Sequence, residues 1–310
     1  MIEVTNLTRR FGQTIAVDGL SFKVQPGEVL GFLGPNGAGK STTMKMLTGY
    51  LRPSSGSARV YGYDIQNQPL EVQRSLGYLP EGAPLYVDMT VAEFLAFTSA
   101  VRGYKGGESL KRIKTVVDLV HLGPVLNKTI ETLSKGFKRR VGLAQAILHD
   151  PKVLILDEPT DGLDPNQKYE VRQLISSMAR DKVIILSTHI LEEVDAVCTR
   201  AIVISNGRLL ADETPQSLLA RSKTYGAIVL ELDDKEIDVK VLNGISGIAK
   251  LEVLATTSGQ SFRIYPNKGQ NVLLDINKSI CHNNWKLRSL TVERGYLDEV
   301  FRTLTTRTAA

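Results

Sequence analysis

The sequence predicts an α/β protein with a mostly parallel core sheet, followed by a smaller α+β domain. Two continuous apolar runs, VLIL at 153–156 and VIIL at 183–186, each end in polar residues. Parallel strands that are buried on both faces have this pattern. The third observation is the glycine-rich stretch LGPNGAGKST at 33–42, which lies between an apolar strand and a segment whose apolar residues recur at helical spacing.

The elements of the N-terminal part follow one another as an α/β domain requires. An alternating segment at 2–11 predicts a strand, and Pro26-Gly27 predicts a turn between two further strands. Thr90 and Glu93 form a capping-box pattern, which predicts the start of a helix. The other expected elements are helix 41–51, strand 74–80, helix 90–103, helix 135–150, strand 152–158 and strand 182–189.

A change of character near residue 220 divides the chain into two predicted domains, 1–220 and 221–310. The second domain contains no recognisable catalytic motif. Its expected elements are strand 227–232, helix 235–245, strand 249–255, a turn at 256–260, strand 261–266, helix 271–284, strand 286–293 and helix 295–305. The order β-α-β-β-α-β predicts a ferredoxin-like, split βαβ domain.

Length and composition limit the classes of protein to consider. The chain has 310 residues, which is typical of two domains. Its net charge of +5 is too small to indicate nucleic acid, so we expect no nucleic-acid partner. Its two cysteines form neither a disulfide framework nor a metal cluster. The N-terminus lacks a signal-peptide pattern, and the apolar runs are far shorter than the ~20 residues that span a bilayer, so we expect a soluble or peripheral protein.

The stretch GPNGAGKS at 34–41 fits the phosphate-loop pattern G-x-x-x-x-G-K-[ST]. Its glycines allow backbone N–H groups to turn inward around phosphate oxygens, and the following helix N-terminus adds its dipole. Lys40 is expected to bridge the β- and γ-phosphates, and Ser41, assisted by Thr42, to bind Mg²⁺. A glycine turn that binds nothing is the alternative. The predicted nucleotide-binding residues of this stretch are Gly34, Pro35, Asn36, Gly37, Ala38, Gly39, Lys40, Ser41 and Thr42.

Two adjacent acids end the apolar run in VLILDEPT at 153–160. Asp157 is a candidate ligand of Mg²⁺, and Glu158 is a candidate for polarising the attacking water. Two carboxylates at the end of a buried strand are costly without a cation or another partner, and a solvated strand end is the alternative. The stretch LNKT at 126–129 lacks the aspartate of a guanine-reading motif, which argues against a GTPase.

The stretch LSKGFKRR at 133–140 resembles the signature loop of ATP-binding cassette (ABC) proteins, which is usually LSGGQ. Ser134 and Gly136 match that loop, whereas Lys135 stands in place of a glycine and Phe137 in place of the glutamine. In that family the loop opens a helix and binds the γ-phosphate of ATP held by the other subunit. The resemblance therefore implies this role for Ser134 and Gly136, and a helix N-terminus is suited to it.

Two further motifs follow in the order of the family. The stretch DGLD at 161–164 resembles the D-loop, and STH at 187–189 resembles the segment that carries the switch histidine. The resemblance implies a nucleotide contact for Asp164 and a γ-phosphate contact for His189. It covers about residues 1–220 and implies a P-loop ABC ATPase cassette with an antiparallel β portion and a helical subdomain beside the core sheet. It also implies ATP and Mg²⁺ as cofactors and hydrolysis of ATP to ADP and phosphate.

Two positions depart from the family pattern. Glu81, in GYLPEGAPLY at 77–86, occupies the position of the usual Q-loop glutamine, where its carboxylate is expected to meet Mg²⁺ or water. Phe11 corresponds to the adenine-stacking aromatic residue, usually tyrosine, and a plain core role is its alternative. The basic pair Arg139-Arg140 is expected to lie on a solvated helix face or to meet a local charge partner. The expected catalytic residues are Lys40, Glu81, Glu158 and His189, and the expected metal ligands are Ser41, Glu81 and Asp157.

Glu81, the signature region and the tail YLDEVFRTLT at 296–305 are together similar to the ATPase subunits of type-2 ABC exporters. This similarity implies a homodimer of cassettes that closes around two ATP molecules beneath separate transmembrane permease subunits, at the cytoplasmic face of the membrane. The candidate contacts with those subunits are Leu85, Tyr86, Phe94 and Phe97, and the i,i+3 spacing of the two phenylalanines favours a core position for them. The alternatives are a soluble ABC ATPase without a role in transport, the ATPase of an importer, and a P-loop kinase or GTPase outside the family.

Overall fold

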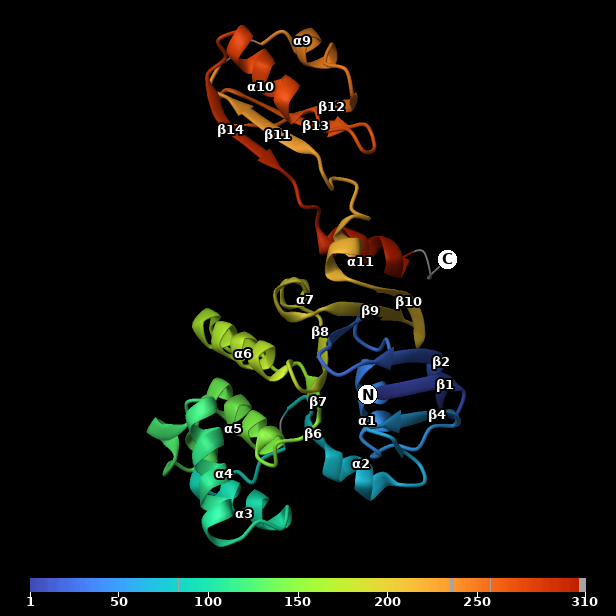
Figure 1. Cartoon of the computed structure of the whole chain (residues 1–310), viewed down its shortest axis with the longest axis vertical. Helices are drawn as coiled ribbons and strands as arrows, with labels where there is room; N and C mark the ends of the chain where they lie inside the picture. Colours follow the sequence, from blue (N-terminus) through green and yellow to red (C-terminus); the bar gives the residue numbers. More distant parts are fainter. Residues whose placement is uncertain (83, 235–236, 257, 307–310) are drawn as a thin grey trace. The chain divides into compact units, whose positions relative to one another are not determined.

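The computed structural model describes residues 1–82, 84–234, 237–256 and 258–306. The chain divides into two compact units, Met1–Pro215 with a short segment from Leu304 onward, and Gln216–Thr303 (Figure 1). Each unit has its own hydrophobic core. The expected helix 235–245 and the expected turn 256–260 each include positions outside the described residues.

A mostly parallel sheet forms the centre of the first unit (Figure 1). Its strands are β3 (Val29–Leu33), β6 (Leu76–Leu79), β7 (Val153–Asp157), β8 (Val183–Thr188), β9 (Arg200–Ser205) and β10 (Arg208–Glu213). The order is β10-β9-β3-β8-β7-β6, with β9 and β10 antiparallel and the other neighbours parallel. Every residue of β3, β7 and β8 is buried, so the fold class predicted from the apolar runs is confirmed.

A second, antiparallel sheet of the first unit consists of β1 (Ile2–Phe11), β2 (Thr14–Val24), β4 (Ser55–Val60) and β5 (Tyr63–Asp64). Its order is β2-β1-β4-β5. The two sheets share one core, in which the ring centroids of Phe22 and Phe32 lie 5.6 Å apart. Burial of one such side chain is worth about 1.5–3 kcal/mol. The strands expected on either side of Pro26-Gly27 are present, and the turn joins one sheet to the other.

The helices of the first unit are α1 (Lys40–Leu47), α2 (Pro69–Ser75), α3 (Val91–Val101), α4 (Gly106–Leu119), α5 (Lys135–Ile147), α6 (Pro165–Met178) and α7 (Leu191–Val197), with 3₁₀ turns at Gly123–Val125 and Ile130–Thr132. Helices α3, α4 and α5 pack together as a helical group (Figure 1). The predicted capping box between Thr90 and Glu93 begins α3. Helix α1 ends at Leu47, earlier than expected, because Gly49 takes up the left-handed region at φ +71°.

The second unit has the predicted β-α-β-β-α-β order. Its elements are β11 (Ile228–Leu232), α9 (Val239–Asn243), β12 (Ile248–Leu254), β13 (Gln260–Pro266), α10 (Leu273–His282) and β14 (Leu287–Val292), with α8 (Pro215–Leu219) before them and α11 (Leu297–Thr306) after them. All strand pairs are antiparallel, in the order β12-β13-β11-β14, as a ferredoxin-like sheet requires. Leu230, Phe262 and Ile264 point from this sheet into a core that includes Leu242 and Ile276.

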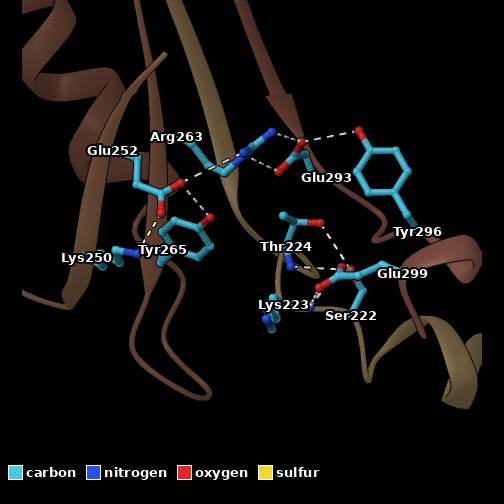
Figure 2. Close-up of polar contacts among 10 residues, drawn as sticks. All are labelled: Ser222, Lys223, Thr224, Lys250, Glu252, Arg263, Tyr265, Glu293, Tyr296 and Glu299. Atoms are coloured by element: carbon cyan, nitrogen blue, oxygen red, sulfur yellow. Dashed lines mark hydrogen bonds and ion pairs between the residues drawn. The ribbon is translucent and has the colours of Figure 1, made fainter. Parts of the chain in front are cut away.

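The opposite face of the second unit's sheet carries paired polar groups (Figure 2). Arg263 donates two hydrogen bonds to the carboxylate of Glu293, at 2.8 and 2.9 Å. Glu252 accepts hydrogen bonds from Tyr265 at 2.9 Å and from Lys250 at 2.6 Å. Tyr265 and Glu252 lie on the paired strands β13 and β12, and a cross-strand contact of this kind favours one strand register. These groups satisfy one another, so the face is a stable polar surface.

Candidate functional site

The loop between β3 and α1 depends on glycine for its conformation. Gly37 and Gly39 lie at φ +80° and +103°, in the region that residues with a side chain rarely adopt. A Cβ atom on Gly39 would lie 2.4 Å from the carbonyl oxygen of Ala16 on β2, so no side chain fits there. At Gly34 the constraint is packing, because a Cβ atom would lie 2.7 Å from the carbonyl oxygen of Ile204.

Lys40 is the first residue of α1 and folds back over this loop. Its side chain is buried, and its Nζ donates hydrogen bonds to the carbonyl oxygens of Gly34 and Pro35 at 2.6 and 3.2 Å. Burial lowers the pKa of Lys40, and the carboxylates of Glu158 and Asp157 act in the opposite direction. The loop thus surrounds an ammonium group whose partners are neutral carbonyl oxygens, which an anionic ligand can replace.

The two acids at the end of β7 have different surroundings. Asp157 is 2% exposed and accepts a hydrogen bond from the hydroxyl of Ser187 on β8. Glu158 takes up the left-handed region at φ +54°, and its carboxylate lies 2.9 Å from Nδ1 of His189. Burial raises the pKa of Glu158, while the hydrogen bond from His189 lowers it in part. The strand end therefore presents one fixed, buried carboxylate and one carboxylate linked to the histidine.

One cavity of about 690 Å³ brings most of the predicted site residues together. It lies at the carboxyl ends of parallel strands, where open α/β sheets hold their ligands. Its volume is within the range of about 300–1,000 Å³ found for small-molecule sites. The predicted residues that line it are Asn36, Gly37, Gly39, Lys40, Ser41, Thr42, Glu81, Asp157, Glu158 and His189. Ala16 and Asp161 also line it, although the sequence did not single them out.

The chemistry of the cavity wall fits a phosphate ester together with a hard cation. The loop offers backbone N–H groups and Lys40 to an anion. The hydroxyl of Ser41 and the carboxylates of Asp157 and Glu81 are the oxygen ligands that Mg²⁺ prefers. The donor set therefore suits a nucleotide with bound Mg²⁺.

Seven predicted residues do not line this cavity: Phe11, Gly34, Pro35, Ala38, Ser134, Gly136 and Asp164. Gly34 and Pro35 face Lys40 through their carbonyl groups. Phe11 is 47% exposed, and the guanidinium carbon of Arg9 lies 4.6 Å from its ring centroid. The alternative of a core role for Phe11 is therefore wrong, because its ring is exposed.

The signature and D-loop residues lie at helix starts. Ser134 caps α5 by accepting a hydrogen bond from the N–H of Phe137 at 3.3 Å. Asp164 caps α6 by accepting one from the N–H of Gln167 at 2.9 Å. Gly136 packs against α6, where a Cβ atom would lie 2.6 Å from Oε1 of Gln167. These three residues thus have local structural roles within their own chain.

The expectation of a solvated face for Arg139 and Arg140 is wrong, because both are buried, at 6% and 7% exposed. Arg140 pairs with Glu170 of α6 at 2.8 Å, so the alternative of a local charge partner holds for it. Arg139 instead contacts the backbone at the ends of β6 and β7. Helical spacing gives a signal for the burial of Arg139, because it lies four residues before Leu143 and therefore on the same buried stripe of α5.

The aromatic residues before the signature divide between core and surface. Phe94 is buried, as its spacing predicts, whereas Phe97 is 41% exposed, so the core expectation for it is wrong. The ring of Tyr86, 57% exposed, stacks edge-on against Phe97 with centroids 5.3 Å apart. The two rings form an exposed aromatic pair on the helical group.

Comparison with known proteins identifies the family. The family described as "ABC transporter" matches residues 17–161. The chain is 31% identical to the linearmycin resistance ATP-binding protein LnrL of Bacillus subtilis, over 99% of each chain. It is 32% identical to the bacitracin transport ATP-binding protein BcrA of Bacillus licheniformis, over 97% of this chain and 96% of that protein. This chain belongs to the ABC transporter family.

Other members of the ABC transporter family match its N-terminal part. The Nod factor export ATP-binding protein I of Paraburkholderia xenovorans is 38% identical over 74% of this chain and 76% of its own length. A solved structure described as the ATP-binding subunit of an ABC transporter superimposes with a TM-score of 0.66 and 30% identity, over 71% of this chain and 92% of that one. The family resemblance inferred from the signature and phosphate loops is therefore confirmed.

Proposed function

We propose that this ABC protein binds and hydrolyses ATP and thereby drives export by separate membrane subunits. The observation that carries the proposal is the cavity that joins the phosphate loop to Asp157, Glu158 and His189. Two similar proteins are named for export or transport and a third for resistance, which favours the exporter over an importer or a soluble ABC ATPase.

Phosphate binding follows from the loop and Lys40. In this proposal, oxygens of the β- and γ-phosphates replace the carbonyl oxygens of Gly34 and Pro35 as hydrogen-bond partners of Lys40 Nζ. Backbone N–H groups of the loop donate to the same phosphate oxygens. Ser41 and Asp157 are the proposed ligands of Mg²⁺, with Glu81 as a further carboxylate at the cavity wall. Mg²⁺ bound there neutralises charge on the phosphates. The hydrogen bond from Ser187 keeps the Asp157 carboxylate oriented for this contact.

Hydrolysis depends on Glu158 and His189. The Glu158 carboxylate is the proposed group that accepts a hydrogen bond from the attacking water and orients it in line with the γ-phosphate. His189 contacts that carboxylate through Nδ1 and is the proposed neighbour of the γ-phosphate at the cavity wall. Catalysis of this kind rests on positioning and electrostatic stabilisation.

A second copy of the chain is the proposed source of the remaining contacts. Ser134, Gly136 and Asp164 do not line the cavity of their own chain. A head-to-tail homodimer, in which these residues face the nucleotide held by the partner's phosphate loop, gives them the role that the family resemblance implies. Closure of such a dimer on ATP and its opening after hydrolysis would transmit motion to the membrane subunits.

The exposed aromatic pair Tyr86 and Phe97 is the proposed contact with the membrane subunits. Exposed aromatic rings are frequent anchors of protein interfaces. No helix within the described residues is both long and apolar enough to cross a bilayer. The names of the export and transport relatives favour the cytoplasmic face of the membrane, reached through the permease subunits, as the proposed location. The C-terminal part, 221–310, is proposed to be an accessory α+β domain.

Single-residue variants test the ATPase proposal. Glu158→Gln should lower kcat by about 10²–10⁴-fold while ATP binding is kept, because only the water-orienting carboxylate is lost. Glu192→Gln is the matched control, since that glutamate is exposed on α7 and does not line the cavity. Full ATPase activity in Glu158→Gln would show that Glu158 is not the catalytic base. Absence of ATP binding and hydrolysis in the unaltered chain would refute the proposal itself.

A further inference from the structure

One buried guanidinium group links three elements around the proposed catalytic acid. Arg139 of α5 is 6% exposed. Its Nη1 donates to the carbonyl oxygen of Pro80 at 2.8 Å, and its Nη2 donates to the carbonyl oxygens of Asp157 and of Glu158, the latter at 2.6 Å. Its Nε is buried and has no hydrogen-bond partner among the described residues. A charged side chain is costly to bury, so this arrangement needs a reason beyond packing.

The first reason lies in the backbone of Glu158. This residue takes up the left-handed region at φ +54°, which persists only where the surroundings impose it. Its N–H donates to the carbonyl oxygen of Ser187 on β8 at 3.0 Å. Its own carbonyl oxygen accepts from Arg139. The peptide groups on either side of the Glu158 Cα are therefore fixed from two elements, and the direction of its carboxylate depends on both.

The second reason for burying Arg139 is that it connects helix α5 with the backbone beside two cavity residues. Ser134 caps the start of α5, five positions before Arg139, and Glu81 directly follows Pro80. The same guanidinium thus touches the backbone next to Glu81 and the backbone of Glu158, which both line the cavity. A planar guanidinium with several fixed donors can hold three carbonyl groups at once, which a lysine ammonium on a flexible stem does less well.

Electrostatics are consistent with this position. Burial lowers the pKa of Arg139, and the carboxylates of Asp157, Asp161, Glu158 and Glu81 act in the opposite direction. An arginine remains protonated under such conditions. The cation therefore stays beside the acidic end of the cavity without touching the proposed nucleotide-binding groups.

We propose that Arg139 is a positioning residue for ATP hydrolysis: it orients Glu158 and couples the signature helix α5 to Glu158 and to the Glu81 loop. The inference rests on the proposed ATPase function. Arg139 has no proposed contact with ATP, so its loss should slow the chemical step more than it weakens nucleotide binding.

Arg140 provides a matched control. It is the next residue of α5, is about as buried, and also has an Nε without a hydrogen-bond partner in the part of the chain that the structure describes. Its Nη atoms contact Glu170 at 2.8 Å and the carbonyl oxygen of Val120 at 3.3 Å. None of these groups lines the cavity. Loss of either guanidinium should therefore disturb packing to a similar degree, whereas only the loss of Arg139 releases Glu158.

The experiment measures kcat, KM and the Kd for ATP of the full chain and of Arg139→Gln, Arg139→Lys and Arg140→Gln, together with the Tm of each. Displacement of a catalytic group by about 1 Å can cost about 10²-fold, so kcat of Arg139→Gln should fall roughly 10- to 100-fold. KM and Kd should stay within about twofold, because ATP contacts are unchanged. Arg139→Lys should recover part of kcat, since it keeps the charge and some donors. Arg140→Gln should keep kcat within about threefold of the unaltered chain, even if its Tm falls as far as that of Arg139→Gln.

Unchanged kcat in Arg139→Gln, or equal losses in Arg139→Gln and Arg140→Gln, would overturn the positioning role while leaving the ATPase proposal intact. If Arg139→Gln does not fold, kcat is compared between Arg139→Lys and Arg140→Lys instead. A lower kcat in Arg139→Lys alone supports the positioning role, and equal kcat values in the two variants overturn it. A chain that binds ATP but shows no Glu158-dependent hydrolysis would overturn both proposals. A parallel loss of kcat and ATP affinity in Arg139→Gln would also contradict the inference, because it indicates a collapsed cavity.

Discussion

Two glycines in the same loop should differ sharply in what an added methyl group costs. In Gly39→Ala the new Cβ would start 2.4 Å from the carbonyl oxygen of Ala16, so the loop and β2 must move apart. The backbone strain at φ +103° adds about 1–2 kcal/mol, and the overlap adds about 1–3 kcal/mol, for a total of about 2–5 kcal/mol. In Gly37→Ala no atom of the described residues lies within 4 Å of the added methyl group. Only backbone strain remains there, and we expect a loss of about 1 kcal/mol.

Urea unfolding followed by two probes tests this difference. The single tryptophan, Trp285, packs against the core of the second unit, so its fluorescence reports that unit. Circular dichroism reports both units. We expect Gly39→Ala to shift the circular-dichroism transition to lower urea and to leave the Trp285 transition unchanged. Equal destabilisation by the two substitutions would refute the steric argument, and a shift of the Trp285 transition would refute the assignment of the effect to the first unit.

Two further predictions concern Lys40 and His149. Lys40→Ala should weaken ATP binding by about 10²-fold, because a charge-assisted contact of ~2–3 kcal/mol is lost; unchanged affinity in a nucleotide titration would exclude Lys40 as a phosphate ligand. Burial, with the charge of Arg102, lowers the pKa of His149 from 6.5 to about 4, so the folded state keeps this ring neutral while the unfolded chain takes up a proton. The free energy of unfolding should therefore fall by up to about 3 kcal/mol as the pH drops from 6.5 to about 4. His149→Gln should reduce this fall. An unchanged pH dependence in the variant would contradict the assignment of the effect to His149.

Several predicted site residues lie at positions that are fixed locally. Lys40 begins a helix directly after a strand and a glycine loop, and Glu158 directly follows a buried strand. Such spacing brings side chains to the same edge of a parallel sheet whatever the rest of the fold does. The capping box of Thr90 is local in the same sense, and it was also predicted correctly.

The features that the sequence did not reveal depend on distant contacts. The burial of Arg139 requires Pro80, 59 positions away, to lie beside the end of β7. A charged residue in a helix is normally expected at the surface, because isolated buried charges are costly. Likewise, the exposure of Phe97 follows from how α3 packs on its neighbours, which a spacing of three residues does not determine. The early end of α1 is different, because Gly49, just beyond its last turn, is a helix-stop signal that the sequence itself contains.

The most direct test of the central claim is co-purification from native membranes. Tagged Glu158→Gln, solubilised in mild detergent with ATP and Mg²⁺, should retain a polytopic membrane protein in a fixed ratio. Tyr86→Glu in the same background should lose it, whereas Tyr169→Glu, which alters another exposed tyrosine of the first unit, should not. Recovery of ribosomes or DNA-repair factors without any membrane protein would contradict the account and indicate a soluble ABC ATPase.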